Sequence, residues 1–394
     1  MKVTGIHHIS AIVWHAQENI DFYTSVLGLK LLKRTLNFDD SNVYHLYYGN
    51  QEGAIGTATT FFPWPKHYKE GIVGDGQVGI TSYIIPLGSK AFWEARLKSF
   101  YIDYNVVSRF DQSFIRFKDP HGISIELVES DLGLDNTFEY HGVTKKEAIR
   151  GFFGSVLYSN DYELTQAFLI DELGLKLVNE SDLYIRLEMD SNVGKYIDIY
   201  KMRTGKSLSG AGTVHHIAFG VEASELDLWV QRLNQKGFNI KEVKDRTFFK
   251  SIYFREPGGI IIELATNTPG FSADKTYVEE PILYMPPHFL HLKEQSEKTL
   301  MPLFIRPVDQ LVNYPYQNKA EYVTWKAHQE LLKDINYYAR LAKQRALTEE
   351  ELSIRETLRK RYIESVTGSV LDQMKRVQVK DKNGEFQPLK SKKD

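Results

Sequence analysis

The chain has 394 residues, of which 42% are hydrophobic and 25% charged, so it is long enough for roughly two domains and too apolar for a disordered chain. Its net charge of −2 does not indicate a nucleic-acid-binding protein. It has no run of roughly 20 apolar residues and no apolar leader, so we expect a cytoplasmic protein without a membrane partner. The absence of cysteine excludes disulfides and thiolate catalysis and leaves His, Asp, Glu or Tyr as metal ligands.

The chain repeats one pattern, a strand followed by an amphipathic helix and two or three further strands. Three pairs of segments carry the repeat: FYTSVLGLKLL at 22–32 with FLIDELGLKLV at 168–178, DPHGISIEL at 119–127 with EPGGIIIEL at 256–264, and IHHISAIV at 6–13 with VHHIAFGV at 214–221.

These segments predict four βαβββ units in chain order. The first has strands at 6–13, 29–36, 43–48 and 56–62, with a helix at 16–27 that ends at Gly28. The second spans 77–130, with strands near 78–86, 113–118 and 122–128 and a helix near 89–100. The third and fourth span about 149–201 and 212–266, and the fourth has a helix near 224–236 that ends at Gly237.

One βαβββ unit cannot bury both its sheet and its helix, so we expect pairs of units to share a curved sheet. The predicted fold class is therefore α+β, with units one and two in an N-terminal half (1–135) and units three and four in a C-terminal half (145–270). Residues 271–394 form an extension, predicted to be mostly helical at 318–344 and 347–364 and to have a basic, frayed end.

The first and last strands of each unit are expected to face a cleft, and only units one and four combine histidines with a carboxylate there. They offer His8, His216 and Glu263, a set with open coordination positions that is typical of non-haem Fe(II) oxygenases, with Mn(II) and Zn(II) as alternatives. A strand histidine can also have a purely structural partner, but an ionised Glu263 within IIIEL is costly unless it is paired or coordinated. Glu126 stands in the matching motif of unit two, and we expect it to be bonded to backbone or solvent.

The segments GIHHISAIV, GTVHHIAFGV and DRTFFKSIYFREPGGIIIELAT resemble the vicinal oxygen chelate superfamily, which includes glyoxalases and extradiol dioxygenases. Within it, the sequence is most similar to hydroquinone and catechol ring-cleaving dioxygenases. The resemblance covers about residues 1–308, and the part after 308 looks like an addition.

This resemblance implies two glyoxalase-like halves and an iron site at the three residues already identified. It also implies a surrounding set of functional residues: His7, Ser10, His215, Arg246 and Tyr253. Ser10 stands where relatives often have threonine, and both side chains carry a hydroxyl.

Physical roles follow for several of these residues. Strand alternation points His7 and His215 to the face opposite the ligands, although His7 could still orient a neighbour. Arg246 could hold a substrate oxygen or form a surface salt bridge. Tyr253 lies ten residues before Glu263 across a Pro-Gly-Gly turn, so the two could lie on adjacent antiparallel strands. Tyr253 could then donate a hydrogen bond or shuttle a proton, or be an ordinary strand tyrosine.

Other histidines near turns or strand ends, including His45 and His121, are expected to be solvated. We therefore expect a Fe(II)-dependent, extradiol-type ring-cleaving dioxygenase whose partners are O2 and a small hydroquinone or catechol, and we leave a homo-oligomer open. The alternatives are a glyoxalase-like isomerase or lyase, and a non-catalytic resistance protein that binds an aromatic or quinone-like toxin.

Overall fold

The structure is a computed structural model, and it forms two compact units, residues 1–316 and 317–394. Each unit is described by itself. The structure describes residues 1–38, 40–64, 70–271, 283–285, 287–294, 296, 300, 303, 305, 335–343, 345–349, 351–352, 354–356, 358–359, 378–380 and 386–388.

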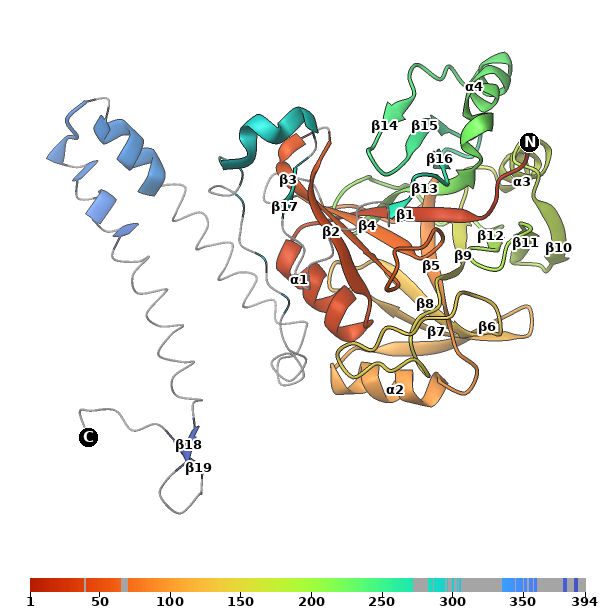
Figure 1. The fold of residues 1–394 in the computed structure, drawn as a ribbon, viewed down its shortest axis with the longest axis horizontal. Coiled ribbons are helices and arrows are strands. Elements are labelled where there is room, and N and C mark those ends of the chain that lie inside the picture. Colours follow the sequence, from red (N-terminus) through yellow and green to blue (C-terminus); the bar gives the residue numbers. More distant parts are fainter. Residues whose placement is uncertain are drawn as a thin grey trace. The chain divides into compact units, whose positions relative to one another are not determined.

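Within these described residues, strands of the first and fourth units form one nine-stranded sheet (Figure 1). Its order is β14 (Lys244–Asp245), β15 (Lys250–Arg255), β16 (Ile261–Thr266), β13 (Thr213–Val221), β1 (Ile6–Val13), β4 (Ala58–Pro63), β3 (Asp40–Gly49), β2 (Lys30–Asn37) and β17 (Leu283–Tyr284).

Strands of the second and third units form a second sheet, eight-stranded over the same described residues. Its order is β10 (Lys176–Glu180), β11 (Tyr184–Glu188), β12 (Tyr196–Tyr200), β9 (Phe152–Tyr158), β5 (Gln77–Ile85), β8 (Ser124–Glu129), β7 (Gln112–Lys118) and β6 (Tyr104–Arg109). The sequence analysis missed β6, a strand whose residues are mostly half-buried or exposed.

The expectation that consecutive units share a sheet is wrong. The central contacts are antiparallel pairings of β1 with β13 and of β5 with β9, which join unit one to unit four and unit two to unit three. The predicted boundaries at 135 and 145 both fall in the connection between β8 and β9. This pairing places the two His-His strands side by side in the middle of one sheet.

Helices follow the first strand of each unit, as predicted. The first is an α-turn, α1 (Ala16–Ile20), that continues as the π-helical η1 (Asp21–Val26) and ends at Gly28 with φ 66°. The others are α2 (Lys90–Ser99), α3 (Tyr162–Asp171) and α4 (Leu226–Gln235), which the short 3₁₀ turn η2 (Ala223–Glu225) precedes. Gly237, with φ 89°, ends α4 as expected.

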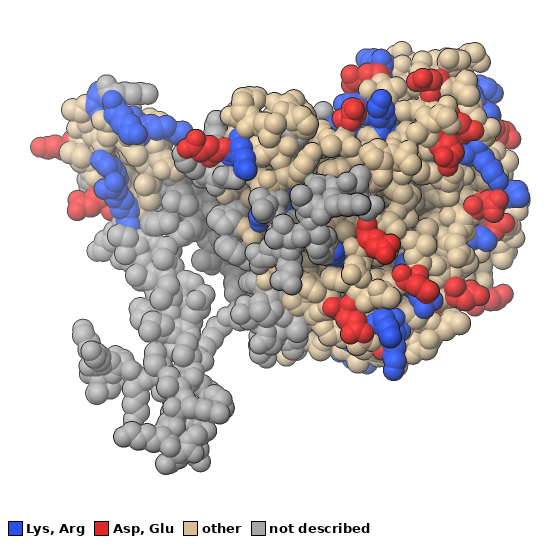
Figure 2. Space-filling model, viewed as in Figure 1, with Lys and Arg blue, Asp and Glu red and all other residues tan. Residues whose placement is uncertain are grey.

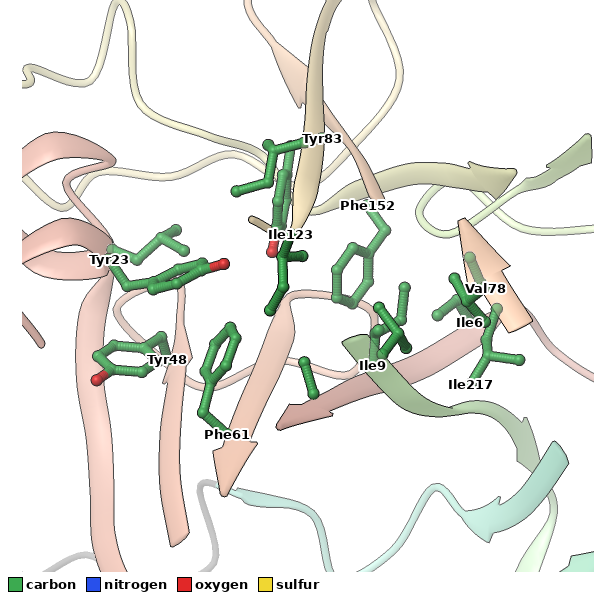
Figure 3. Packing of buried hydrophobic residues seen from close by; sticks show 14 of the residues in the cluster. Ile6, Ile9, Tyr23, Tyr48, Phe61, Val78, Tyr83, Ile123, Phe152 and Ile217 are labelled. Atoms are coloured by element: carbon green, nitrogen blue, oxygen red, sulfur yellow. The ribbon is translucent and has the colours of Figure 1, made fainter. Parts of the chain in front are cut away.

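One hydrophobic core draws on all four units (Figure 3). Tyr23 of η1 packs on Phe61 of β4 with ring centroids 4.3 Å apart, and Tyr83 of β5 stacks on Phe152 of β9 at 5.2 Å. Each buried aromatic side chain contributes about 1.5–3 kcal/mol through the apolar area it removes from water. The two sheets are therefore held in a single compact unit.

The chain after residue 271 contributes to the first sheet as well as to the extension. β17 pairs in parallel with β2, and the 3₁₀ turn η4 (Pro287–Leu292) follows it. In the second unit, residues 335–343 are helical, as predicted, while 318–334 lie outside the described residues. Near the end of the chain, β18 (Gln378–Lys380) pairs antiparallel with β19 (Phe386–Pro388), and the rest of the predicted frayed end lies outside the described residues.

The surface carries charges of both signs. Figure 2 shows Lys and Arg interspersed with Asp and Glu over the visible face of the coloured residues. No helix among the residues described is long and apolar enough to span a bilayer.

Candidate metal centre

Three buried side chains from three neighbouring strands converge in the nine-stranded sheet. His8 of β1 and His216 of β13 direct their Nε2 atoms at Glu263 of β16, with Nε2–Oε2 distances of 3.1 and 2.8 Å. The two Nε2 atoms are 3.3 Å apart. The structure thus brings together the three residues that the sequence analysis selected, and their donor atoms are close enough to hold one metal ion.

The donor set fits a cation. Adjacent ligands at roughly 90° around an ion with bonds of about 2.1 Å lie about 3 Å apart, which matches these three distances. Glu263 Oε2 is fully buried and has no hydrogen bond, although two ring nitrogens lie within 3.1 Å of it. Lone pairs that face one another in this way are costly without a positive charge between them.

Electrostatics keep the donors in the states that a metal requires. Burial lowers the pKa of the His216 imidazole, which keeps it neutral. Burial alone would raise the pKa of Glu263, but His8 and His216 outweigh that effect and hold the pKa well below its usual value. A neutral imidazole and an ionised carboxylate are the forms that coordinate metals.

The histidines next to the ligands do not point to the opposite face, so that expectation is wrong. The β1–β13 register shifts twice. On β1, Ile6 and His8 pair with consecutive residues of β13, so His7 has no paired residue. On β13, His216 and Val214 pair with consecutive residues of β1, so His215 has none. His7 and His215 are therefore the extra residues of two β-bulges, and a bulge re-aims its side chain.

Both bulged histidines contact the candidate ligand that follows them. Nδ1 of His7 lies 2.8 Å from Nδ1 of His8, and Nδ1 of His215 lies 2.8 Å from Nδ1 of His216. His7 Nε2 lies 3.2 Å from the Thr266 carbonyl oxygen, so His7 donates from Nε2 and accepts at Nδ1. Burial lowers the pKa of His7 to about 3, which leaves that acceptor available. A proton held on Nδ1 of His8 leaves its Nε2 lone pair for a metal.

Tyr253 holds the other oxygen of Glu263. The two residues are directly opposite each other on β15 and β16, which confirms the predicted adjacency. The Tyr253 hydroxyl donates to Oε1 over 2.7 Å. Burial and the Glu263 charge raise the Tyr253 pKa well above its usual value, so the hydroxyl stays protonated.

A cavity of about 210 Å³ opens next to the three donors. An engineered cavity of roughly 150 Å³ binds benzene, so this one accommodates a single aromatic ring. The Arg246 guanidinium lies 5.5 Å from the Phe38 ring and 5.7 Å from the Tyr253 ring. The cavity lining is His8, Ser10, Ile12, Asn37, Phe38, His45, Tyr47, Phe62, Trp64, His215, His216, Arg246, Phe249 and Tyr253.

The sequence analysis missed His45, which is buried and lines the cavity instead of being solvated. Its strand, 43–48, alternates so that His45 and Tyr47 share a face, and this was the available signal. His121 is also buried, against the ring of Trp14.

Among the residues that the structure describes, the second sheet carries no such centre at the equivalent register. Glu126 pairs with Ser82 as Glu263 pairs with Ala218, but Glu126 accepts hydrogen bonds from Arg109, Arg116 and the Ser82 hydroxyl. The expectation of backbone or solvent partners for Glu126 is therefore wrong. Arg116 stands opposite Glu126 where Tyr253 stands opposite Glu263.

Comparison with known proteins gives the family. The Glyoxalase/Bleomycin resistance protein/Dioxygenase superfamily matches residues 5–83 and 153–264. The chain is 43% identical over 312 residues to "Putative ring-cleaving dioxygenase MhqO" of Bacillus subtilis (strain 168), a match that covers 78% of this chain and 99% of that protein. The chain belongs to this superfamily.

Two further relatives are similar over a comparable share of the chain. "Chlorohydroquinone/hydroquinone 1,2-dioxygenase" of Sphingobium indicum is 32% identical over 287 residues, which covers 70% of this chain and 88% of that protein. A crystal structure named "putative dioxygenase from Bacillus subtilis subsp. subtilis str. 168" is 43% identical with a TM-score of 0.75, and covers 77% of this chain and 99% of that one.

The C-terminal extension matches a different family. Residues 330–392 match a family described as a bacterial protein of unknown function, DUF896. The extension expected beyond about residue 308 thus includes a segment with relatives of its own.

Proposed function

We propose that this protein is a Fe(II)-dependent ring-cleaving dioxygenase that inserts both atoms of O2 into a hydroquinone or catechol. The observation that carries the proposal is the buried His8–His216–Glu263 set, whose three facing donors fit a cation and leave coordination positions free on the cavity side. The names of the relatives, which include a hydroquinone 1,2-dioxygenase, support this choice of reaction.

Fe(II) bound by these three residues would pass electron density between a diol and O2 and so overcome the spin barrier to their reaction. Mn(II) and Zn(II) fit the same donors, but zinc has no redox chemistry to offer. The protein's own contribution is to fix the donors, orient the ring and manage protons.

The surrounding residues then have definite tasks. Tyr253 holds Glu263 Oε1 and thereby leaves Oε2 as the single oxygen that faces the site. His7 and His215 fix the protonation of His8 and His216. Arg246 offers its guanidinium to a phenolate oxygen of the substrate, and the rings of Phe62 and Phe249 enclose the aromatic ring and exclude water.

The glyoxalase-like alternative usually requires a second carboxylate on the metal. In unit one, the strand that could supply this carboxylate is β4. Ser10 of β1 pairs with Thr60 of β4, and the equivalent pair in the second sheet is Val156 of β9 with Asp198 of β12. Thr60 therefore stands where the second sheet has an aspartate. A neutral hydroxyl at this position favours the three-residue set over a four-ligand site.

The test is oxygen uptake after anaerobic reconstitution with Fe(II), over a small panel of hydroquinones and catechols. We expect stoichiometric uptake and, with ¹⁸O2, two labelled oxygen atoms in the ring-opened product. Zn(II)-loaded protein and Glu263→Gln are the matched inactive controls. Stoichiometric zinc in the purified protein, combined with no uptake by the iron form, would reject the dioxygenase in favour of a glyoxalase-like enzyme.

A further inference from the structure

A chain of hydrogen bonds leads away from the cavity through residues that the function above does not use. The Ser10 and Thr60 hydroxyl oxygens are 2.7 Å apart, Thr60 Oγ1 is 2.9 Å from His45 Nε2, and His45 Nδ1 is 2.8 Å from the Tyr47 hydroxyl. The four side chains come from β1, β4 and β3 and are all buried. Ser10, His45 and Tyr47 also line the cavity.

The chain can run in one of two directions, and these differ in which end hydroxyl donates into the cavity. A neutral imidazole has one N–H, so His45 accepts at one nitrogen and donates from the other. Within the described structure, the hydrogen bond of the Tyr47 hydroxyl is the one to His45, and either group can be its donor. In one of the two directions, the Tyr47 hydroxyl donates to Nδ1 and His45 Nε2–H donates to Thr60 Oγ1.

The remaining protons follow from this assignment. Thr60 Oγ1 then accepts the hydrogen bond from His45 Nε2–H, and the Thr60 hydroxyl donates to Ser10 Oγ. The Ser10 hydroxyl is left to donate into the cavity. The reverse direction would turn the Ser10 proton away from the cavity and would leave the Tyr47 proton to face the cavity instead, because Tyr47 lines it as well.

We propose that His45 is a positioning residue for ring cleavage: through Thr60 it fixes the Ser10 hydroxyl as a hydrogen-bond donor to an anionic oxygen of the bound diol. The identity of the ligand rests on the proposed function, whereas the direction of the chain does not. A donor held in place before the reaction begins stabilises negative charge on the diol without reorganisation.

Two pairs of variants test the role. Gln can place an amide N–H where His45 has Nε2–H, whereas Asn is too short to reach Thr60. Thr60→Ser keeps the hydroxyl, whereas Thr60→Val keeps the shape and removes it. We expect His45→Asn and Thr60→Val to lower kcat for hydroquinone about tenfold with little change in KM, and His45→Gln and Thr60→Ser to stay within about twofold of the parent.

Iron content and thermal stability of each variant show whether the metal site and fold persist. Equal losses in both members of a pair would mean that packing, and not the hydrogen bond, matters at that position, and would overturn the proposal.

A second readout does not depend on turnover. Long-range ¹H–¹⁵N spectra of metal-free protein labelled at histidine distinguish the two imidazole tautomers, and the His45 signals are those lost in His45→Gln. We expect the proton on Nε2 in the parent. An active enzyme with the proton on Nδ1 would overturn the directed chain and leave the proposed function standing. An inactive protein with the proton on Nε2 would reject the proposed function and support the directed chain.

Discussion

The buried ion cluster of the second sheet gives a sharp prediction for stability. Glu126 is fully buried and accepts from Arg109 at 2.9 and 3.2 Å and from Arg116 at 2.6 and 2.9 Å. Asp198 accepts from the other side of Arg109 at 2.6 Å. Glu126→Gln keeps the shape and removes the charge, so Arg109 keeps only one of its two carboxylate partners, Asp198.

The magnitude follows from the burial of the partners. Removal of one partner from a buried ion pair costs about 3–5 kcal/mol. Arg109 keeps Asp198, and the Arg116 side chain is 30% exposed and can be solvated, so we expect the lower end, about 3 kcal/mol. At roughly 2–4 °C per kcal/mol for a domain of 150–250 residues, the melting temperature should fall by about 6–12 °C.

The pH dependence has a definite sign. Burial would raise the pKa of Glu126, but Arg109, Arg116 and Ser82 outweigh it and lower the pKa below the ordinary value of 4.5. A carboxylate with a depressed pKa contributes stability above its unfolded-state pKa and loses it as the pH falls through the folded-state pKa. The stability gap between parent and Glu126→Gln should therefore be full above about pH 4.5 and shrink below it.

The assay is thermal and denaturant unfolding of both proteins across this pH range, with oxygen uptake measured at a temperature where both are folded. Glu263→Gln is the matched control, because it changes the equivalent carboxylate without depriving a guanidinium of its partner. Glu126→Gln should keep its iron and its turnover per folded molecule. A variant of unchanged stability, or one that stays stable and loses turnover, would refute this assignment of Glu126 to the scaffold.

Three further predictions concern the metal site and the extension. Tyr253→Phe frees Glu263 Oε1 and should weaken metal binding about tenfold in a chelator competition; unchanged affinity with a lower kcat would assign Tyr253 to proton transfer instead. His7→Phe keeps the ring packing against Phe249 and Phe271 but removes the acceptor for His8, and should cost roughly 10–100-fold in metal affinity; retention of full affinity would contradict that role for His7. A protein that ends at residue 316 should fold and keep kcat/KM within about twofold, because 78% of this chain already matches 99% of MhqO; an insoluble or inactive product would show that the extension is part of the enzyme.

The convergence of His8, His216 and Glu263 could be predicted because it depends on local pattern. The repeated His-His strands and the carboxylate in IIIEL mark equivalent positions in units one and four, and alternation along β15 and β16 makes Tyr253 the neighbour of Glu263. The two bulges could not be predicted, because a bulge is set by the register between β1 and β13, which are about 200 residues apart in the chain.

The pairing of unit one with unit four and of unit two with unit three could not be predicted from the sequence either. The units resemble one another, so similarity alone does not say whether unit one pairs with unit two or with unit four. The arginine cluster shows the same limit, since Arg109 lies on β6, a strand too exposed to give an apolar pattern, and reaches Asp198 of another unit.

The two sheets each bury one glutamate at an equivalent position, and the partners of the two glutamates differ. Each carries a glutamate at the same register with no exposed surface, and such a charge is tolerated only beside a positive one. In the second sheet, arginines supply that charge from within the chain. In the first, Glu263 contacts a tyrosine hydroxyl and two imidazoles, and the Nδ1 atoms of these imidazoles contact His7 and His215. A divalent cation bound by His8, His216 and Glu263, as we propose, would place a positive charge directly beside this carboxylate.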